Sequence, residues 1–272
     1  MSTQTDLSRQ ITILELHRKK QAGEKIVCLT AYDASFAQIL DNAGVDVVLV
    51  GDSLGMVVQG QETTLPVEMD AMTYHSACVA KGTQRALLIA DMPFLSFTSI
   101  NEALKNAGRL MKQGGAQMVK LEGGGDQAEI VQALSSQGIP VCAHLGLQPQ
   151  RVHKIGGYRV QGRDANSAKQ MLDDALALEQ AGADLMLLEC VPEALASDIT
   201  KKLNIPVIGI GAGADCDGQI LVLYDILDIS FGLRPKFSKN FLAETGSIDA
   251  AIKAYVEAVR KGEFPSAAHS FQ

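Results

Sequence analysis

Carboxylate side chains stand at the ends of several apolar runs in this sequence, where each run gives way to a turn. The best example is Asp52, which follows the run 47–50 within Gly51-Asp52-Ser53. A carboxylate at the end of a buried strand is unfavourable unless a cation or a hydrogen-bond donor pairs with it. The pattern indicates a cation-binding or acid–base site, although an isolated Asp52 could equally cap a turn. Other polar side chains stand in the same position along the chain, at Asp33, Asp91, Glu122, His144 and Glu189.

The types of these side chains favour magnesium as the cation. Carboxylate oxygens are ligands that Mg²⁺ prefers, and the ion usually takes one or two of them and fills its other positions with water and substrate oxygens. The chain has no Cys-x-x-Cys or His-x-x-x-His spacing, which would favour zinc. We expect Asp52 and Asp91 to be the first ligands, with Glu122 at the ion or directly behind it. Pro93 fixes the backbone just after Asp91.

Glu189, His144 and Lys120 are candidates for proton transfer and substrate binding. Glu189 ends the apolar run 185–188, and a carboxylate in apolar surroundings is a candidate general base. Its alternative role is to cap the helix expected after it. His144 is a candidate to bind a substrate carboxylate or carbonyl, or else a hydrogen-bonded histidine of the core. Lys120 lies two residues before Glu122, so both side chains point to the same face of their strand.

Strand-like and helix-like segments alternate along nearly the whole chain, and this alternation must position the polar residues. It indicates a parallel sheet, and the length and number of units favour an α/β fold of the (β/α)₈ barrel type over an open doubly wound sheet. In a barrel the loops after the strands face one mouth, so the polar residues would converge there. A first helix is expected at 11–21, with Thr12 as its N-cap. Near the end of the chain we expect a short helix at 218–223, a weak strand at 227–230 and a final helix at 248–261.

The composition argues against several classes of protein. The 272 residues are 47% hydrophobic and carry a formal net charge of −7, whereas nucleic-acid binding would require a basic patch. No apolar stretch is long enough to span a bilayer, and residues 1–10 are polar and lack the apolar segment of a signal peptide. We expect a cytoplasmic protein that acts on small molecules, without nucleic-acid or membrane partners. It would form a single barrel domain over residues 1–272, with a short N-terminal helix and a C-terminal helix.

Many segments from near Thr30 to the C-terminus together resemble one known family. They are TAYD, AGVDVVLVGDSLGMVVQG, TTLPVEMD, YH, ADMPF, VKLEGG, HLGLQPQ, VQGR, LLECVP, IGIGAG, CDGQILV and GEFPSAAHSF. The family that they resemble is ketopantoate (3-methyl-2-oxobutanoate) hydroxymethyltransferase. The resemblance implies a TIM barrel of the phosphoenolpyruvate mutase and isocitrate lyase-like group, commonly assembled as a homodecamer.

The resemblance also implies a reaction and a set of site residues. Such enzymes use Mg²⁺ and 5,10-methylenetetrahydrofolate as co-substrate. They hydroxymethylate 3-methyl-2-oxobutanoate through a Mg-stabilised enolate and so form 2-dehydropantoate, on the route to pantothenate and coenzyme A. Carried over to this chain, the site residues are Asp52, Asp91 and Glu122 for the metal, Ser53, Lys120 and His144 with the two aspartates for the keto acid, and Glu189 as the base.

This chain departs from the family pattern at two positions near the expected site. Gln148 stands where threonine is usual, and Leu95 stands where glycine is common. Neither residue is among the expected ligands, so the departures concern the loop after His144 and the mouth beside Asp91. The long, glycine-rich segment 151–163 is expected to be a mobile lid over that mouth.

Two other functions fit parts of the sequence. A mutase or carbon–carbon lyase on a related barrel would carry a catalytic loop with a Lys-Cys-Gly-His-like sequence, which this chain lacks. A non-catalytic binding protein on the same barrel would not need a base and a pair of metal ligands at one mouth.

Overall fold

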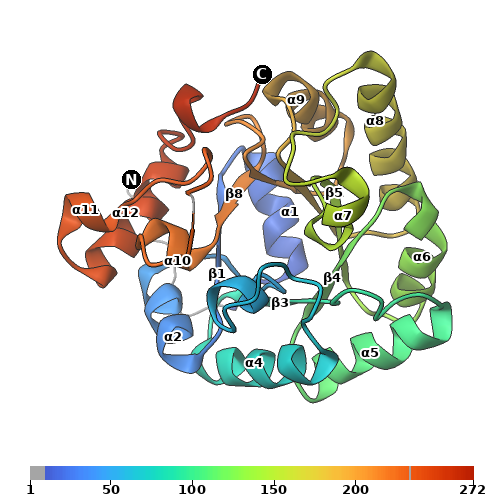
Figure 1. The fold of residues 1–272 in the computed structure, drawn as a ribbon, viewed down its shortest axis with the longest axis horizontal. Helices are drawn as coiled ribbons and strands as arrows, with labels where there is room; N and C mark the ends of the chain where they lie inside the picture. Colours follow the sequence, from blue (N-terminus) through green and yellow to red (C-terminus); the bar gives the residue numbers. More distant parts are fainter. Residues whose placement is uncertain (1–9, 233) are drawn as a thin grey trace.

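The computed structural model describes residues 10–232 and 234–272, and within them the chain forms a closed barrel of parallel strands (Figure 1). Each strand pairs with the next, and β8 pairs with β1, with Cys28 opposite Ile220. This closure rules out the open sheet. The strands are β1 (Ile26–Thr30), β2 (Val47–Val50), β3 (Leu87–Asp91), β4 (Met118–Glu122), β5 (Val141–Gly146), β6 (Leu185–Glu189), β7 (Val207–Ile210) and β8 (Gly218–Leu221).

Helices surround the barrel, and short helices lie in several of the connections between strands (Figure 1). The longer helices are α1 (Ile13–Ala22), α2 (Ala34–Ala43), α4 (Met69–Gly82), α5 (Ile100–Lys112), α6 (Ala128–Ser136), α8 (Ala165–Gln180), α9 (Glu193–Lys202) and α12 (Ile248–Arg260). The short ones are α3 (Leu54–Val57), α7 (Val152–Ile155), α10 (Leu223–Ile226) and α11 (Leu242–Thr245), with 3₁₀ turns η1 (Gly125–Gln127), η2 (Pro149–Arg151) and η3 (Ala267–His269).

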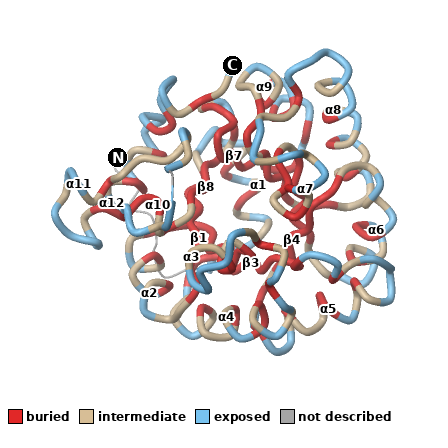
Figure 2. Tube along the Cα trace, in the orientation of Figure 1, coloured by how far each residue is buried: buried red, intermediate tan, exposed pale blue. Residues whose placement is uncertain are grey.

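The strands are buried along almost their whole length, and they appear as the red interior of Figure 2. Side chains fill the inside of the barrel and helices cover its outside, so a strand of this fold has no face toward water. A polar side chain on such a strand must therefore find its partners within the protein. Within the described part of the chain, no helix is long and apolar enough to cross a membrane. Residues 1–9, which make up most of the polar start of the chain, lie outside the described residues.

Two predicted capping positions had different outcomes. Thr12 caps α1 as predicted, and its side chain accepts a hydrogen bond from the Glu15 amide at 3.3 Å. Asp33, one of the polar residues predicted to meet at the mouth, instead caps α2: its Oδ1 accepts hydrogen bonds from the Ser35 and Phe36 amides at 2.8 and 3.0 Å. Asp33 is thus a helix cap, because the N-terminal amides of α2 are the nearest donors.

The end of the chain differs from the sequence prediction in two places. Residues 218–221 form strand β8 instead of the start of a helix, and residues 227–230 form no strand. Periodicity does not distinguish a helix from a strand in so short an apolar run, and closure of the barrel decides, since β8 bonds to both β1 and β7. Gly218 permits this pairing, because a Cβ there would lie 2.4 Å from the carbonyl oxygen of Ile26.

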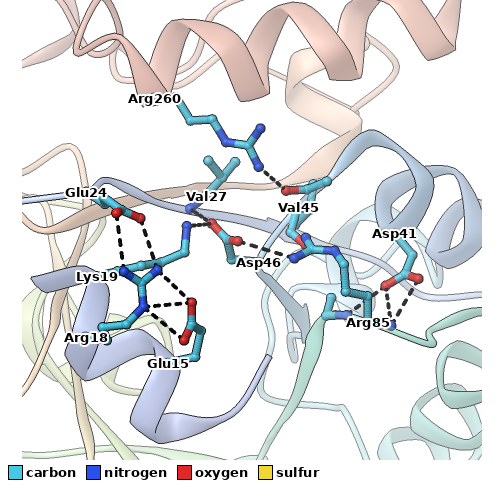
Figure 3. Close-up of polar contacts among 12 residues, drawn as sticks. Glu15, Arg18, Lys19, Glu24, Val27, Asp41, Val45, Asp46, Arg85 and Arg260 are labelled. Atoms are coloured by element: carbon cyan, nitrogen blue, oxygen red, sulfur yellow. Dashed lines mark hydrogen bonds and ion pairs between the residues drawn. The ribbon is translucent and has the colours of Figure 1, made fainter. Parts of the chain in front are cut away.

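A buried ion cluster closes the N-terminal end of the barrel (Figure 3). Asp46, directly before β2, lies 3.1 Å from Lys19 Nζ of α1 and 3.6 Å from Arg85 Nη1. The Val27 amide donates a further hydrogen bond to Asp46 Oδ2 at 3.0 Å. Arg85 also donates to the carbonyl oxygen of Val45. At this end one buried carboxylate therefore faces two cations.

Candidate active site

The carboxyl ends of the strands open into a cavity of about 730 Å³. The structure brings all seven expected site residues to its wall, from the ends of β2 to β6 or the turns directly after them. Asp33 does not line this cavity. The seven residues are Asp52, Ser53, Asp91, Lys120, Glu122, His144 and Glu189.

Asp91 and Lys120 form a buried ion pair on the adjacent strands β3 and β4, where the strand register places them opposite each other. Lys120 Nζ donates to Asp91 Oδ1 at 2.5 Å, and the Asp52 amide donates to Asp91 Oδ2 at 2.9 Å. Burial by itself would lower the pKa of Lys120, but the carboxylates of Asp91, Glu122 and Asp52 outweigh it and raise that pKa. Lys120 is therefore a fixed positive charge in the cavity.

Asp52 and Glu122, the two carboxylates near this ion pair, lie in environments that disfavour their charged forms. Burial, with the Asp91 carboxylate beside it, raises the pKa of Asp52 to about 7. Burial, with Asp52 beside it, raises the pKa of Glu122 well above its ordinary value. Three buried carboxylates thus share one ammonium group, Lys120.

The donor set fits a hard divalent cation such as Mg²⁺. Carboxylate oxygens are its preferred ligands, and the excess of buried negative charge is what a cation would relieve. In residues 10–232 and 234–272, no three His, Cys, Asp or Glu side chains converge as a ready-made metal site. The fit is therefore to an ion held by one or two carboxylates, which completes its coordination with water and substrate oxygens.

His144 lies between the carboxylates of Glu122 and Glu189. Its Nδ1 is 3.6 Å from Glu122 Oε1, and its Nε2 is 3.4 Å from Glu189 Oε2. Neither ring nitrogen makes a hydrogen bond of normal geometry to the described residues. Burial, with the Lys120 ammonium nearby, holds the pKa of His144 well below its ordinary range. A neutral imidazole with unsatisfied nitrogens in a cavity is suited to bind a ligand, in contrast to a satisfied core histidine.

Glu189 ends β6 and does not cap the helix that follows, because Pro192 occupies the N-cap position of α9. Its side chain is 16% exposed. Burial raises the pKa of Glu189 to about 8; Lys120 opposes this rise, and the carboxylates of Asp52 and Asp91 add to it. A carboxyl group with a pKa near neutrality can accept a proton under ordinary conditions, as a general base must.

Two residues of this site were not identified from the sequence. Tyr32, in the turn after β1, shares a hydrogen bond of 2.9 Å between its hydroxyl and that of Ser53, and so fixes the Ser53 side chain. Gln150, in η2 after β5, contacts two of the carboxylates, Asp52 and Glu122. Both residues lie in segments that resemble the family, TAYD and HLGLQPQ, but their residue types carry no chemical signal of their own.

The segment expected to be a lid borders the cavity. Residues 151–163 begin within η2 and α7 and then run across the rim, where Tyr158 and Arg159 line the cavity. The Tyr158 hydroxyl contacts Met56 Sδ at 3.6 Å. Burial, with Glu189 nearby, raises the pKa of the Tyr158 hydroxyl. Leu95, where the family commonly has glycine, lies in the loop after β3 with a φ of +60°.

Comparison with known proteins places the chain in a family. A family model described as ketopantoate hydroxymethyltransferase matches residues 10–267. A protein of Alkalilimnicola ehrlichii named 3-methyl-2-oxobutanoate hydroxymethyltransferase is 62% identical, over 97% of this chain and 95% of the relative. A protein of the same name from Nitrosococcus oceani is 60% identical, over 94% of this chain and 97% of the relative.

Solved structures share the barrel fold of this chain. A 2,3-dimethylmalate lyase, described as a member of the PEP mutase/isocitrate lyase superfamily, has a TM-score of 0.58 and 16% identity, over 90% of this chain and 98% of that structure. A phosphonopyruvate hydrolase complex with oxalate and Mg²⁺ has a TM-score of 0.60 and 14% identity, over 96% of this chain and 93% of that structure. At such low identity these likenesses show the fold alone. The family model and the close relatives go further: this chain belongs to the ketopantoate hydroxymethyltransferase family.

Proposed function

We propose that this chain transfers a hydroxymethyl group from 5,10-methylenetetrahydrofolate to 3-methyl-2-oxobutanoate and so forms 2-dehydropantoate, a step toward pantothenate and coenzyme A. Membership of the family supports this choice of substrates. One structural observation supports the chemistry: Glu189, with a pKa raised to about 8, opens into the same cavity as three further buried carboxylates and Lys120. A base beside a cation site is what proton removal next to a carbonyl group requires.

In this proposal, Lys120, Ser53 and His144 bind the keto acid, together with the Asp52 and Asp91 positions. Lys120 supplies a fixed positive charge for the substrate carboxylate. Neutral His144 offers one N–H donor, and Ser53 offers a hydroxyl oriented by Tyr32. Groups that are already held in place lose little freedom when the substrate binds.

Glu189 then removes the proton from C3 of the keto acid. Its neighbour His144 limits the positions open to the carboxylate, since Nε2 lies 3.4 Å from Glu189 Oε2. The methylene carbon carried by the folate is bonded to two nitrogens, and both bonds break: one is replaced by the bond to the enolate carbon and the other by the hydroxyl of a water molecule. The proton taken from C3 and the remaining proton of that water go to the two folate nitrogens. The net reaction consumes one water and releases tetrahydrofolate.

Asp52 and Asp91 would hold Mg²⁺, with Glu122 at the ion or close to it. When bound, the ion would polarise the keto oxygen and stabilise negative charge as the proton leaves. The chain's own contribution is to keep these carboxylates close together despite their repulsion, through the Asp52 amide, Lys120 and burial at the barrel mouth.

The decisive experiment is to measure 2-dehydropantoate formed from 3-methyl-2-oxobutanoate and 5,10-methylenetetrahydrofolate, with Mg²⁺ and after removal of divalent ions by a chelator. We expect product only when Mg²⁺ is present. Product without any divalent ion would overturn the metal part of the proposal. No product from folded protein, but cleavage of a 2-hydroxy diacid, would favour a lyase.

The resemblance also supports proposals about organisation. We propose a single barrel domain, a homodecamer, and a cytoplasmic location. Light scattering of the purified chain tests the assembly, since a mass other than ten times the 29.0 kDa of the chain would contradict it.

A further inference from the structure

Gln150 contacts two of the buried carboxylates from a single position. Its side-chain Nε2 donates to Asp52 Oδ2 at 2.9 Å, and its backbone amide donates to Glu122 Oε2 at 3.0 Å. Gln150 is only 5% exposed, and Asp52 and Glu122 are equally well buried. Hydrogen bonds from a donor to a buried carboxylate are among the stronger ones in proteins.

The orientation of the Gln150 amide is fixed by its second contact. Nε2 also donates to the carbonyl oxygen of Met92 at 3.0 Å, so both of its hydrogens have acceptors. A flipped amide would point its oxygen at two acceptors, Asp52 Oδ2 and Met92 O, and would be repelled by both. The side chain is therefore held as a donor toward Asp52.

The loop that carries Gln150 is itself anchored. Pro149 starts the 3₁₀ turn η2 and restricts its backbone. Arg151, the next residue, forms an exposed ion pair of 2.9 Å with Asp126 of η1, the turn after β4. These contacts restrict the position of the Gln150 amide, and a residue that supports other side chains must itself be held in place.

We propose that Gln150 is a positioning residue, which holds Asp52 and Glu122 in the arrangement that accepts the divalent cation. Gln150 engages one oxygen of each carboxylate, Asp52 Oδ2 and Glu122 Oε2, and does not contact the other oxygen of either. It donates to the carboxylates and does not touch the ion. This inference rests on the metal site of the proposed function. Supporting hydrogen bonds of this kind typically contribute about 10–100-fold to metal affinity.

The test measures binding of Mn²⁺, as a paramagnetic substitute for Mg²⁺, by electron paramagnetic resonance of the free ion. Gln150→Met keeps the length of the side chain and removes the side-chain donor to Asp52, whereas the backbone amide that donates to Glu122 remains. We expect the Kd for Mn²⁺ to rise by about 10–100-fold. Gln150→Asn, a shortened amide, should also weaken binding, and it carries the test if the methionine variant does not fold.

Gln148→Met is the matched control. Gln148 is in the same loop and is 8% exposed, and its side chain makes no hydrogen bond to the described residues. We expect its Kd for Mn²⁺ to stay within twofold of the unmodified protein. Equal losses in the Gln148 and Gln150 variants would show an effect of loop packing and overturn the proposal.

The remaining outcomes separate this inference from the proposed function. If the unmodified protein binds Mn²⁺ and folded Gln150→Met binds it equally well, Gln150 has no positioning role and the metal site stands. If the unmodified protein binds no Mn²⁺, both the metal site and this inference fall. A lower melting temperature of the Gln150→Met protein with unchanged Mn²⁺ affinity would mean a purely structural residue and would also overturn it.

Discussion

The two ends of strand β2 carry buried aspartates in opposite electrostatic settings. Asp46, before the strand, faces Lys19 and Arg85, so its charge is more than balanced (Figure 3). Asp52, after the strand, lies near further carboxylates, and the nearby ammonium of Lys120 is already paired with Asp91. Only the four residues 47–50 and Gly51 separate the two aspartates in the sequence.

The difference shows what each end of the barrel does for the protein. A carboxylate that faces two buried cations stabilises the fold, because removing it leaves both cations without a carboxylate. Buried carboxylates that outnumber the nearby cations destabilise the fold, and they favour the binding of any ligand that brings positive charge. Changes at the closed end should therefore affect stability, and changes at the mouth should affect chemistry.

The largest effect is expected at the mouth. Glu189→Gln removes the base and keeps the shape of the side chain, so kcat should fall by about 10²–10⁴-fold. The measurement is the rate of 2-dehydropantoate formation at saturating substrates. The melting temperature should not fall, because no cation depends on Glu189 alone. Normal turnover by this variant would contradict the mechanism and leave a binding role open.

The matching change at the closed end should affect stability instead. Asp46→Asn leaves Lys19 and Arg85 buried without a carboxylate, so the free energy of unfolding should fall by about 3–5 kcal/mol. Urea denaturation measures this. Asp70→Asn is the control, since Asp70 pairs with Arg109 while 87% exposed, and its loss should leave the midpoint unchanged. Equal midpoints for the Asp46 and Asp70 variants would break the comparison between the two ends.

The dependence of activity on pH should reflect the protonation of Glu189 at the mouth. A base acts only when deprotonated, and the raised pKa of Glu189 extends its protonated form to higher pH. The value of kcat/KM should therefore fall about tenfold for each pH unit below the pKa of about 8 and level off above it. A profile of initial rates from about pH 5 to about pH 10 checks this, since it extends about three units below and about two units above the pKa of about 8. An acid limb at the ordinary pKa of a glutamate would show that the carboxyl group is not perturbed.

The smallest effect is expected beside the mouth, in the loop after β3. Leu95 has a φ of +60°, a conformation that glycine adopts more readily than other residues, and the residue is 60% exposed. The left-handed conformation costs a residue with a Cβ roughly 1–2 kcal/mol, and the greater conformational entropy that glycine loses on folding offsets roughly 0.5–1 kcal/mol of this. Leu95→Gly should therefore raise the free energy of unfolding by about 0.5–1 kcal/mol. Leu95→Ala keeps the Cβ and serves as control, since it should bring no gain. A loss of stability in the glycine variant would mean that contacts of the leucine outweigh the backbone strain.

The fold and the mouth could be predicted from the sequence because they follow from short-range patterns. Apolar runs that end in a carboxylate mark the ends of barrel strands, and the closed topology then brings Asp52, Asp91 and Glu189 together without knowledge of any contact. The pattern failed at residues 218–223, since a short apolar run is compatible with both a helix and a strand. There the pairing with β1 and β7 decided.

The contacts that organise the mouth could not be predicted in the same way. Gln150 lies 98 positions from Asp52, and the sequence gives no sign that its amide reaches that carboxylate. Tyr32 and Ser53 likewise meet only because the loops after β1 and β2 are neighbours in the barrel. Uncharged polar residues are common in loops, so their type alone does not distinguish a supporting residue from a solvated one.

The hydrogen bond from the Gln161 amide to the carbonyl oxygen of Cys190, 2.9 Å long, limits how far the rim of the cavity can travel. This hydrogen bond tethers Gln161, one end of the segment 156–161, to the residue after Glu189. The other end is Gly156, at the C-terminus of α7. An extended chain spans about 3.3–3.6 Å per residue, so Tyr158, which is two residues from Gly156, can lie no more than roughly 7 Å from that end. If the rim moves as the sequence predicts, it would therefore move as a short flap, while the backbone beside the base stays anchored.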